Sequence, residues 1–150
     1  MDAPISDVLL IEKVAVNDEE IGGFIALATI NRPNKLNALN SEVMEALKNF
    51  CAWAEADSKI RCIVITGAKP LAPLEGKRPK PNAFVAGADI SEFVDMDSQA
   101  AKIKFTDNAV EAIWNLTKPT IAMIDGFALG GGSEVACSCC LLYTSPSPRD

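Results

Sequence analysis

The sequence predicts an α/β domain built from alternating strands and helices. Short apolar runs rich in β-branched residues alternate with longer segments whose apolar residues recur every three or four positions, the patterns of buried strands and amphipathic helices. Two glycine-rich segments stand where a predicted strand runs into a predicted helix. At 150 residues the chain has room for one core of ordinary size, so these elements are expected to share it.

A β-hairpin is predicted at the N-terminus. Residues 8–16 and 24–30 are apolar and β-branched, and the Ile-Gly-Gly sequence at 21–23 supplies the turn between them. Residues 31–40 contain Pro33 and four asparagines, which favours a loop, and Ser41 is predicted to cap the helix that follows.

One long helix and one buried strand come next. The helix is predicted over residues 41–57 from an apolar stripe formed by Val43, Leu47, Phe50 and Ala54, and residues 61–66 predict the strand. Residues 68–82 carry four lysines and arginines, one glutamate and four prolines, which predicts a surface loop with a local charge of +3. Phe84 and Val85 then lead into the first glycine-rich segment.

The second half of the chain repeats the alternation. A helix is predicted over residues 98–116, a buried strand over 120–124, and a further helix starting near Ser133 after the glycines of 126–132. From Leu141 onward, prolines and serines dominate, so no helix or strand is expected to close the domain. We therefore expect residues 1–140 to be the N-terminal part of a larger domain and residues 141–150 to be a tail of foreign or disordered character.

The composition excludes several classes of function. The chain has no histidine, which rules out Ser-His triads and HExxH zinc sites and leaves carboxylates, thiols, lysines and backbone dipoles for any chemistry. A net charge of −6 argues against a nucleic-acid-binding surface. Cys137, Cys139 and Cys140 cannot all point the same way on one helix, so no metal site is expected.

The same composition bears on the compartment. The five cysteines are odd in number and three lie within four residues, which predicts free thiols in a reducing, cytoplasmic environment. The first ten residues lack the basic and apolar stretches of a signal peptide, and no apolar run approaches the roughly 18 residues of a membrane span.

The two glycine-rich segments, residues 84–90 and 126–132, are candidate anchors for an oxygen atom. Small side chains allow close approach to the backbone, and a helix start leaves N–H groups without intrahelical partners. Neither segment fits G-x-G-x-x-G or G-K-[ST], so no nucleotide site is indicated. Glu134 follows Gly131 by three residues and could act as a base beside these N–H groups, or only as a partner of the helix dipole.

The motifs NRP…LNAL (31–39), FVAGADI (84–90) and KPTIA…GFALGGGSE (118–134) together resemble the enoyl-CoA hydratase/isomerase (crotonase) family. The resemblance covers residues 8–140 and implies a spiral of ββα units, here truncated before the family's C-terminal helices. It also implies a fatty-acyl or enoyl thioester of coenzyme A as substrate. Coenzyme A then enters with the substrate, and no separate cofactor is expected.

The resemblance assigns roles to individual positions. It places the thioester oxygen between the N–H groups of Ala88 and Gly131 and makes Glu134 the group that activates water for addition to a 2-enoyl thioester. A second catalytic glutamate and the helices that build a homotrimer or a dimer of trimers belong to later parts of the family's chain. The positions that match its substrate-binding segments are Lys35, Leu36, Ala38, Ala86, Gly87, Asp89, Ile90 and Gly130.

Alternatives remain open. Within the same fold, the reaction could instead be double-bond isomerisation, which can use one carboxylate. The 150 residues could also be a truncated, non-catalytic fragment that binds coenzyme A. The basic loop at 68–82 is either a solvated insertion or a source of additional contacts to the phosphates of coenzyme A.

Overall fold

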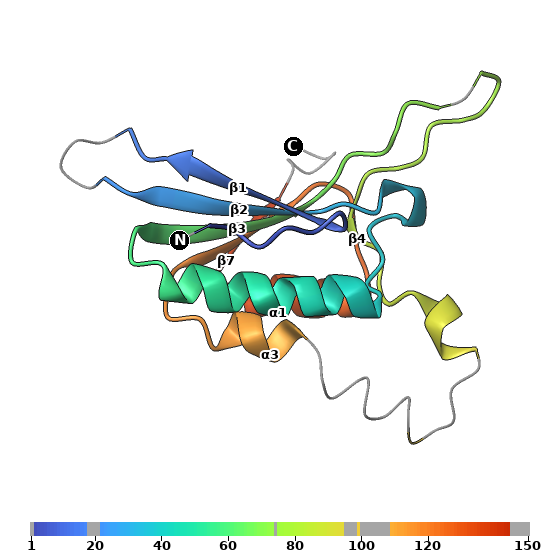
Figure 1. Ribbon diagram of the computed structural model, residues 1–150. Coiled ribbons are helices and arrows are strands. Elements are labelled where there is room, and N and C mark those ends of the chain that lie inside the picture. Colours follow the sequence, from blue (N-terminus) through green and yellow to red (C-terminus); the bar gives the residue numbers. More distant parts are fainter. Residues whose placement is uncertain (1, 18–21, 74, 95–98, 100–108, 145–150) are drawn as a thin grey trace.

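Three successive ββα units make up the described part of the chain in the computed structural model (Figure 1). The structure describes residues 2–17, 22–73, 75–94, 99 and 109–144. The first unit contains β1 (Leu9–Ala15), β2 (Phe24–Ile30) and α1 (Ser41–Ala56). The second contains β3 (Ile60–Gly67), β4 (Ala83–Val85) and α3 (Ala109–Trp114), and the third contains β5 (Thr120–Ile124), β6 (Phe127–Ala128) and α4 (Gly131–Ser138). The α/β class and the ββα order predicted from the sequence are both present.

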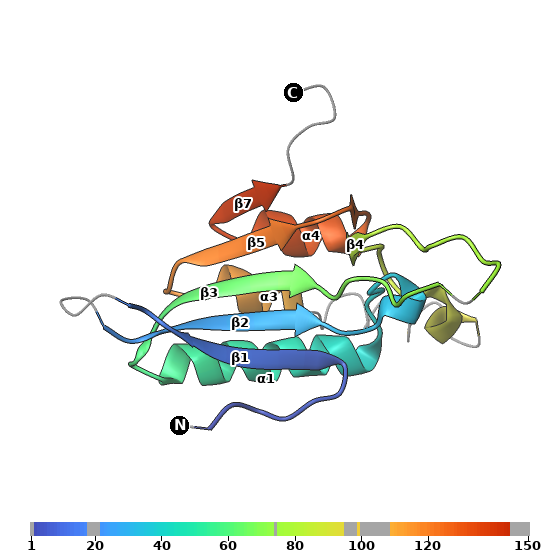
Figure 2. The ribbon, with the colours of Figure 1, turned by 90° about the horizontal axis from the view of Figure 1, so that it is seen from above.

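The described strands form two sheets. The larger sheet has the order β1-β2-β3-β5-β7, where β7 spans Leu141–Thr144, and only the β1-β2 pair is antiparallel (Figure 2). β4 and β6 pair in parallel as a separate two-stranded sheet. Because β4 runs into the glycine-rich segment 84–90 and β6 lies within the segment 126–132, this small sheet brings the two segments together.

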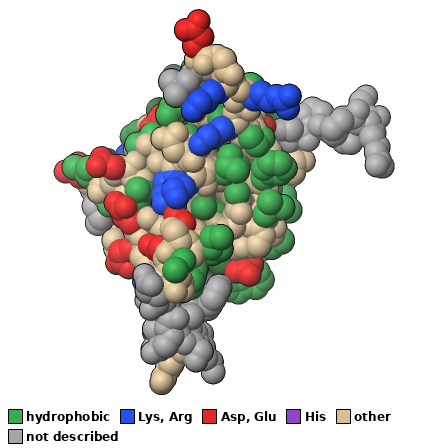
Figure 3. All heavy atoms as spheres, turned by 90° about the vertical axis from the view of Figure 1, so that its right-hand side faces the viewer, with side chains coloured by type: hydrophobic (Ala, Val, Ile, Leu, Met, Phe, Trp, Pro, Cys, Tyr) green, Lys and Arg blue, Asp and Glu red, His purple; other side chains and the backbone are tan. Residues whose placement is uncertain are grey.

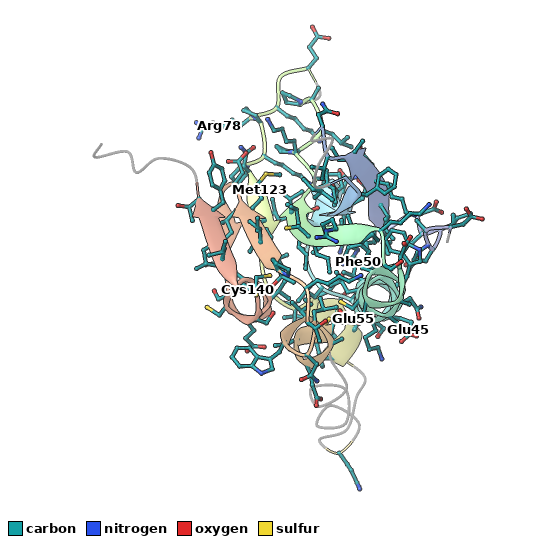
Figure 4. All side chains as sticks on the ribbon, turned by 90° about the vertical axis from the view of Figure 1, so that its left-hand side faces the viewer. Glu45, Phe50, Glu55, Arg78, Met123 and Cys140 are labelled. Atoms are coloured by element: carbon teal, nitrogen blue, oxygen red, sulfur yellow. The ribbon has the colours of Figure 1, made fainter. Side chains whose placement is uncertain are left out.

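The core lies between the large sheet and the helices, which cover one of its faces (Figure 1). In α1, Val43, Leu47, Phe50 and Ala54 are completely buried, which confirms the predicted apolar stripe. Phe50 points from α1 toward the sheet, whereas Glu45 points away from it (Figure 4). The stripe fixes the rotation of α1, and thereby the position of the loop that precedes it.

Two expectations about element ends were wrong. The N-cap of α1 is Asn40, whose side chain accepts a hydrogen bond from the N–H of Val43 at 3.0 Å, while the Ser41 hydroxyl donates instead to the Glu92 carboxylate. Residues from Leu141 do form a strand, because β7 pairs with the otherwise open edge of β5. The proline-rich residues 145–150 lie outside the described residues, so the character of the tail stays a prediction.

The helix predicted over residues 98–116 is described only in part. α3 covers Ala109–Trp114, and residues 95–98 and 100–108 lie outside the described residues. The basic loop is as exposed as predicted wherever it is described between residues 71 and 82, and it projects away from the core (Figure 1). No helix in the described part of the chain is long and apolar enough to cross a membrane.

Candidate active site

The loop between β2 and α1 is held in shape by a buried asparagine. A short 3₁₀ helix (Pro33–Lys35) precedes Leu36 and Asn37, which both adopt left-handed backbone conformations with φ of 51° and 56°. The Asn37 side chain donates to the carbonyls of Ala68 and Ala83 at 2.9 and 2.8 Å and accepts from the N–H of Arg32 at 3.0 Å. Asn37 thus joins the loop to the ends of β3 and β4. The sequence predicts only a turn for these asparagines; the tolerance of Asn for φ > 0 is the signal that points to Asn37.

The segment after β4 pairs with this loop through one isolated bridge. The N–H of Leu39 donates to the Gly87 carbonyl at 2.8 Å, and the N–H of Asp89 donates to the Leu39 carbonyl at 2.7 Å. Gly87 has a φ of 107°, which a residue with a side chain would adopt only under strain. In the trans peptide between Gly87 and Ala88, the N–H points opposite to the carbonyl. The Ala88 N–H therefore points away from Leu39.

The third segment delivers a second N–H group to the same place. Leu129 donates its N–H to the Val85 carbonyl at 3.0 Å, and Gly130 turns the chain with a φ of 50° so that α4 begins at Gly131. A Cβ built on Gly131 would lie 4.0 Å from the Ala88 nitrogen. Among the hydrogen bonds of the described residues, none is donated by the backbone N–H of Ala88 or Gly131. The two donors predicted from the sequence are thus neighbours, and both are available.

Gly132 serves packing rather than ligand approach. A Cβ at this position would come within 2.1 Å of the Val85 carbonyl oxygen and 2.8 Å of its Cβ. Gly132 is buried, so α4 can lie directly against β4 only because this position has no side chain. This close approach fixes the distance between the two glycine-rich segments.

Glu134 lies in the first turn of α4, exposed to solvent. Its backbone N–H donates to the Gly130 carbonyl at 3.2 Å, and the preceding Ser133 hydroxyl closes the turn by donating to the Ala128 carbonyl at 2.7 Å. Residues three apart on a helix share a face, so the Glu134 side chain projects on the same side as Gly131. A carboxylate and two backbone N–H groups therefore occupy one end of the molecule.

The Asp89 carboxylate is engaged within the protein. Its Oδ1 accepts from the Ser91 hydroxyl at 2.6 Å and from the Ser91 N–H at 3.3 Å, and its Oδ2 pairs with Arg32 at 2.8 Å. The hydrogen bond from Ser91, followed by that from Arg32, lowers the pKa of Asp89 to about 2. Asp89 is therefore ionised at neutral pH, and both oxygens already have protein partners. The position of Asp89 matches a predicted substrate-binding segment, and this role stays a prediction. Its side chain, however, binds Arg32 and Ser91 within the protein.

The remaining predicted substrate-binding residues surround the same end. The Leu36 carbonyl accepts the N–H of Ala86 at 3.1 Å, which sets the 31–40 loop beside the segment after β4. Lys35 and Ile90 are exposed, and Lys80 of the basic loop donates to the Asn34 carbonyl at 2.8 Å. Lys and Arg side chains gather on this end of the molecule below the tip of the 68–82 loop (Figure 3).

The thiols divide into buried and exposed groups. Burial raises the pKa of Cys51 to about 12 and that of Cys139 to about 11, so both are protonated at neutral pH and poor nucleophiles. Cys137 and Cys140 are exposed. In the described part of the chain, no three Cys, Asp or Glu side chains converge in a way that could hold a metal ion.

The family assignment follows from comparison with known proteins. The family model for enoyl-CoA hydratase/isomerase matches residues 20–149. The chain is 40% identical over 129 residues to the short-chain-enoyl-CoA hydratase of Clostridium acetobutylicum, covering 85% of this chain and 45% of that protein. It is 35% identical over 130 residues to a probable enoyl-CoA hydratase of Rhizobium meliloti, covering 87% of this chain and 46% of that protein.

Solved structures agree with the sequence comparison. The crystal structure of an enoyl-CoA hydratase/carnithine racemase from Magnetospirillum magneticum matches with a TM-score of 0.76 and 28% identity, covering 93% of this chain and 47% of that one. The fold is thus the mixed α/β crotonase-like fold. The chain spans about half the length of the curated relatives it matches. With its family model matched over residues 20–149, this chain belongs to the enoyl-CoA hydratase/isomerase family.

Proposed function

We propose that this chain supplies the oxyanion-binding half of an enoyl-CoA hydratase, which converts 2-enoyl-CoA thioesters into 3-hydroxyacyl-CoA. One observation carries the proposal: the N–H groups of Ala88 and Gly131 are adjacent and without acceptors among the described residues, and Glu134 follows one turn later. The names of relatives at 35–40% identity support the same reaction class.

The two N–H groups act on the thioester carbonyl. When water adds at C3, negative charge develops on the thioester oxygen, and two fixed backbone donors stabilise that charge more than they stabilise the neutral substrate. Each donor of this kind contributes about 10² to 10³ in rate. Because the donors belong to backbone held by β4 and α4, they need no reorganisation during the reaction.

Glu134 handles the proton that the attacking water must lose. Its carboxylate accepts that proton as the water oxygen bonds to C3, and the second glutamate, which belongs to later parts of the family's chain, gives a proton to C2 and completes the addition. The Asp89 carboxylate is not a competing base at neutral pH, because Arg32 and Ser91 occupy its oxygens.

The test is hydration of crotonyl-CoA by the full-length gene product that carries these residues. We expect loss of the conjugated thioester absorbance with the unchanged protein and a fall in kcat of about 10² to 10⁴ in Glu134→Gln. Glu111→Gln is the matched control, because Glu111 is also an exposed glutamate in the first turn of a helix. Full activity in Glu134→Gln would contradict the role given to Glu134.

Isomerisation of a 3-enoyl-CoA is the second candidate within this fold. It is favoured by the engagement of Asp89, which leaves Glu134 as the carboxylate without a recorded partner among the described site residues. A single carboxylate can move a proton between C2 and C4. Supplying 3-enoyl-CoA and watching for the conjugated thioester separates the two reactions.

A third candidate is a non-catalytic piece that binds coenzyme A. A 150-residue product that unfolds cooperatively and hydrates crotonyl-CoA would exclude it. For the full-length protein we propose a homotrimer or a dimer of trimers in the cytoplasm, with residues 145–150, beyond β7, as a tail of foreign or disordered character. Sizing of the purified gene product by light scattering tests the assembly.

A further inference from the structure

Arg32 lies where the 31–40 loop meets the 86–90 segment, which carries the Ala88 N–H. We propose that Arg32 is a positioning residue which, together with Asp89, clasps the 31–40 loop to the 86–90 segment and so aims the Ala88 N–H at the thioester oxygen. The inference rests on the proposed function, because it assumes that the Ala88 N–H binds that oxygen.

The guanidinium of Arg32 makes two contacts, one on each side of the crossing. Its Nη1 donates to the Ala38 carbonyl at 2.6 Å, and its Nη2 donates to Asp89 Oδ2 at 2.8 Å. The Arg32 and Asp89 side chains are only 16% and 9% exposed, so solvent screens the pair weakly. The planar fork of an arginine suits two acceptors held at fixed positions.

These contacts flank the bridge that orients the donor. Leu39, which follows Ala38, binds both the Gly87 carbonyl and the Asp89 N–H. The Gly87–Ala88 peptide is therefore held on both sides. Its carbonyl accepts the N–H of Leu39, and Asp89, the residue after Ala88, pairs with Arg32. Rotation of that peptide would swing the Ala88 N–H away from Gly131, and it would require the Asp89 or Leu39 contacts to break.

Asp89 is itself fixed by a second residue. The Ser91 hydroxyl and N–H hold its Oδ1, so the carboxylate presents Oδ2 to Arg32 in one orientation. The Arg32 backbone also takes part, because its N–H donates to the Asn37 side chain and its carbonyl accepts from the N–H of Asn37 at 2.9 Å. Both partners of the ion pair, Arg32 and Asp89, are therefore held in place by further hydrogen bonds.

A second ion pair of the same length provides a matched control. Lys13 and Asp57 pair at 2.8 Å, and the Asp57 side chain is 5% exposed. Asp57 follows the C-terminal end of α1, whereas the site lies beyond its N-terminal end. The 16 residues of α1 separate the two by about 24 Å. Removing either pair takes away a comparable interaction, but only one lies at the oxyanion site.

The experiment compares Arg32→Met, Arg32→Lys, Asp89→Asn and Asp57→Asn in the full-length protein. Two readouts are taken: kcat and KM for crotonyl-CoA hydration, and the enolate absorbance of bound acetoacetyl-CoA, which reports stabilisation of negative charge on the thioester oxygen. We expect Arg32→Met and Asp89→Asn to lower kcat about 10- to 100-fold with little change in KM, and to weaken the enolate absorbance. Arg32→Lys should recover part of the kcat and part of the enolate absorbance. Its ammonium can reach one of the two acceptors but cannot bind both as the guanidinium does.

Asp57→Asn should lower the thermal midpoint while leaving kcat and the enolate absorbance unchanged. If Arg32→Met and Asp57→Asn behave alike in both readouts, the clasp is a stability element only and the proposal is overturned. If the unchanged protein neither hydrates crotonyl-CoA nor shows an enolate band, the proposed function fails first, and the positioning role falls with it.

Discussion

Replacing Gly131 with proline removes one proposed oxyanion donor and leaves the rest of the helix start in place. Gly131 is the first residue of α4, and its N–H donates no recorded hydrogen bond among the described residues. Proline is well tolerated at the first position of a helix, because the missing N–H has no intrahelical acceptor there and the fixed φ suits a helix. Gly131→Pro therefore deletes a donor without deleting a helical hydrogen bond.

The expected loss of kcat follows from the role of the N–H group and from the space around Gly131. Loss of one donor lowers kcat about 10² to 10³, or roughly 2.7–4 kcal/mol of transition-state stabilisation. A new Cβ would lie 3.2 Å from Leu39 Cδ1, a side-chain end that can shift by a few tenths of an ångström. Gly131→Ala adds the same Cβ but keeps the N–H. Its kcat should stay within about tenfold of the unchanged protein, which corresponds to about 1.4 kcal/mol in activation free energy.

The assay is steady-state hydration of crotonyl-CoA by the full-length protein and both variants, with thermal unfolding measured alongside. Both variants carry the added Cβ, so their ratio measures the effect of replacing the N–H group by the proline ring. Equal losses of kcat in Gly131→Pro and Gly131→Ala would refute the donor role of Gly131, since crowding of Leu39 would then explain both.

Three further predictions concern stability. Gly132→Ala should lower the free energy of unfolding by about 1–3 kcal/mol in chemical denaturation, because its Cβ would meet the Val85 carbonyl oxygen at 2.1 Å; an unchanged midpoint would contradict the close packing. Asn37→Ala should lower the free energy of unfolding by about 1–3 kcal/mol for each of the Ala68 and Ala83 carbonyls left unpaired. Asn34→Ala is the exposed control, and equal denaturation midpoints for the two variants would contradict the role of the Asn37 side chain. Hydrogen bonds, chiefly from Lys13 and Ser91 respectively, lower the pKa values of Asp57 and Asp89 from 3.8 to about 2, so these carboxylates stabilise the fold above pH 3.8 and lose that contribution as pH falls toward 2. Acid denaturation should accordingly be shallower in Asp57→Asn than in the unchanged protein, and a superimposable curve would contradict the linkage.

The elements with strong periodicity were predictable. The hairpin, α1, β3 and β5 follow from alternation or helical spacing that lies within each segment. The cap of α1 was misplaced by one residue because Ser41 and Asn40 are both good caps, and the choice depends on Glu92, 51 residues away, which takes the Ser41 hydroxyl. β7 was missed because the prolines beyond it dominate the local composition, while the strand forms against the open edge of β5.

The site was predictable in its donors but not in its support. The family motifs indicated Ala88, Gly131 and Glu134 as candidates, and the strand–glycine–helix pattern gave a physical reason for each. The contacts that hold these positions join residues far apart in sequence: Arg32 reaches Asp89 across 57 positions, and Asn37 reaches Ala83 across 46. Such pairings depend on tertiary folding and leave no periodic trace in the sequence, which is why Arg32 and Asn37 were not singled out.

The carbonyl stretch of a bound thioester tests the central claim most directly. The measurement is an infrared difference spectrum of a saturated acyl-CoA, labelled with ¹³C at the thioester carbonyl, bound to the full-length protein. If the N–H groups of Ala88 and Gly131 bind the thioester oxygen, the stretch moves to lower frequency than in free solution, and Gly131→Pro reverses most of the shift. A bound thioester that absorbs at its solution frequency would contradict the account.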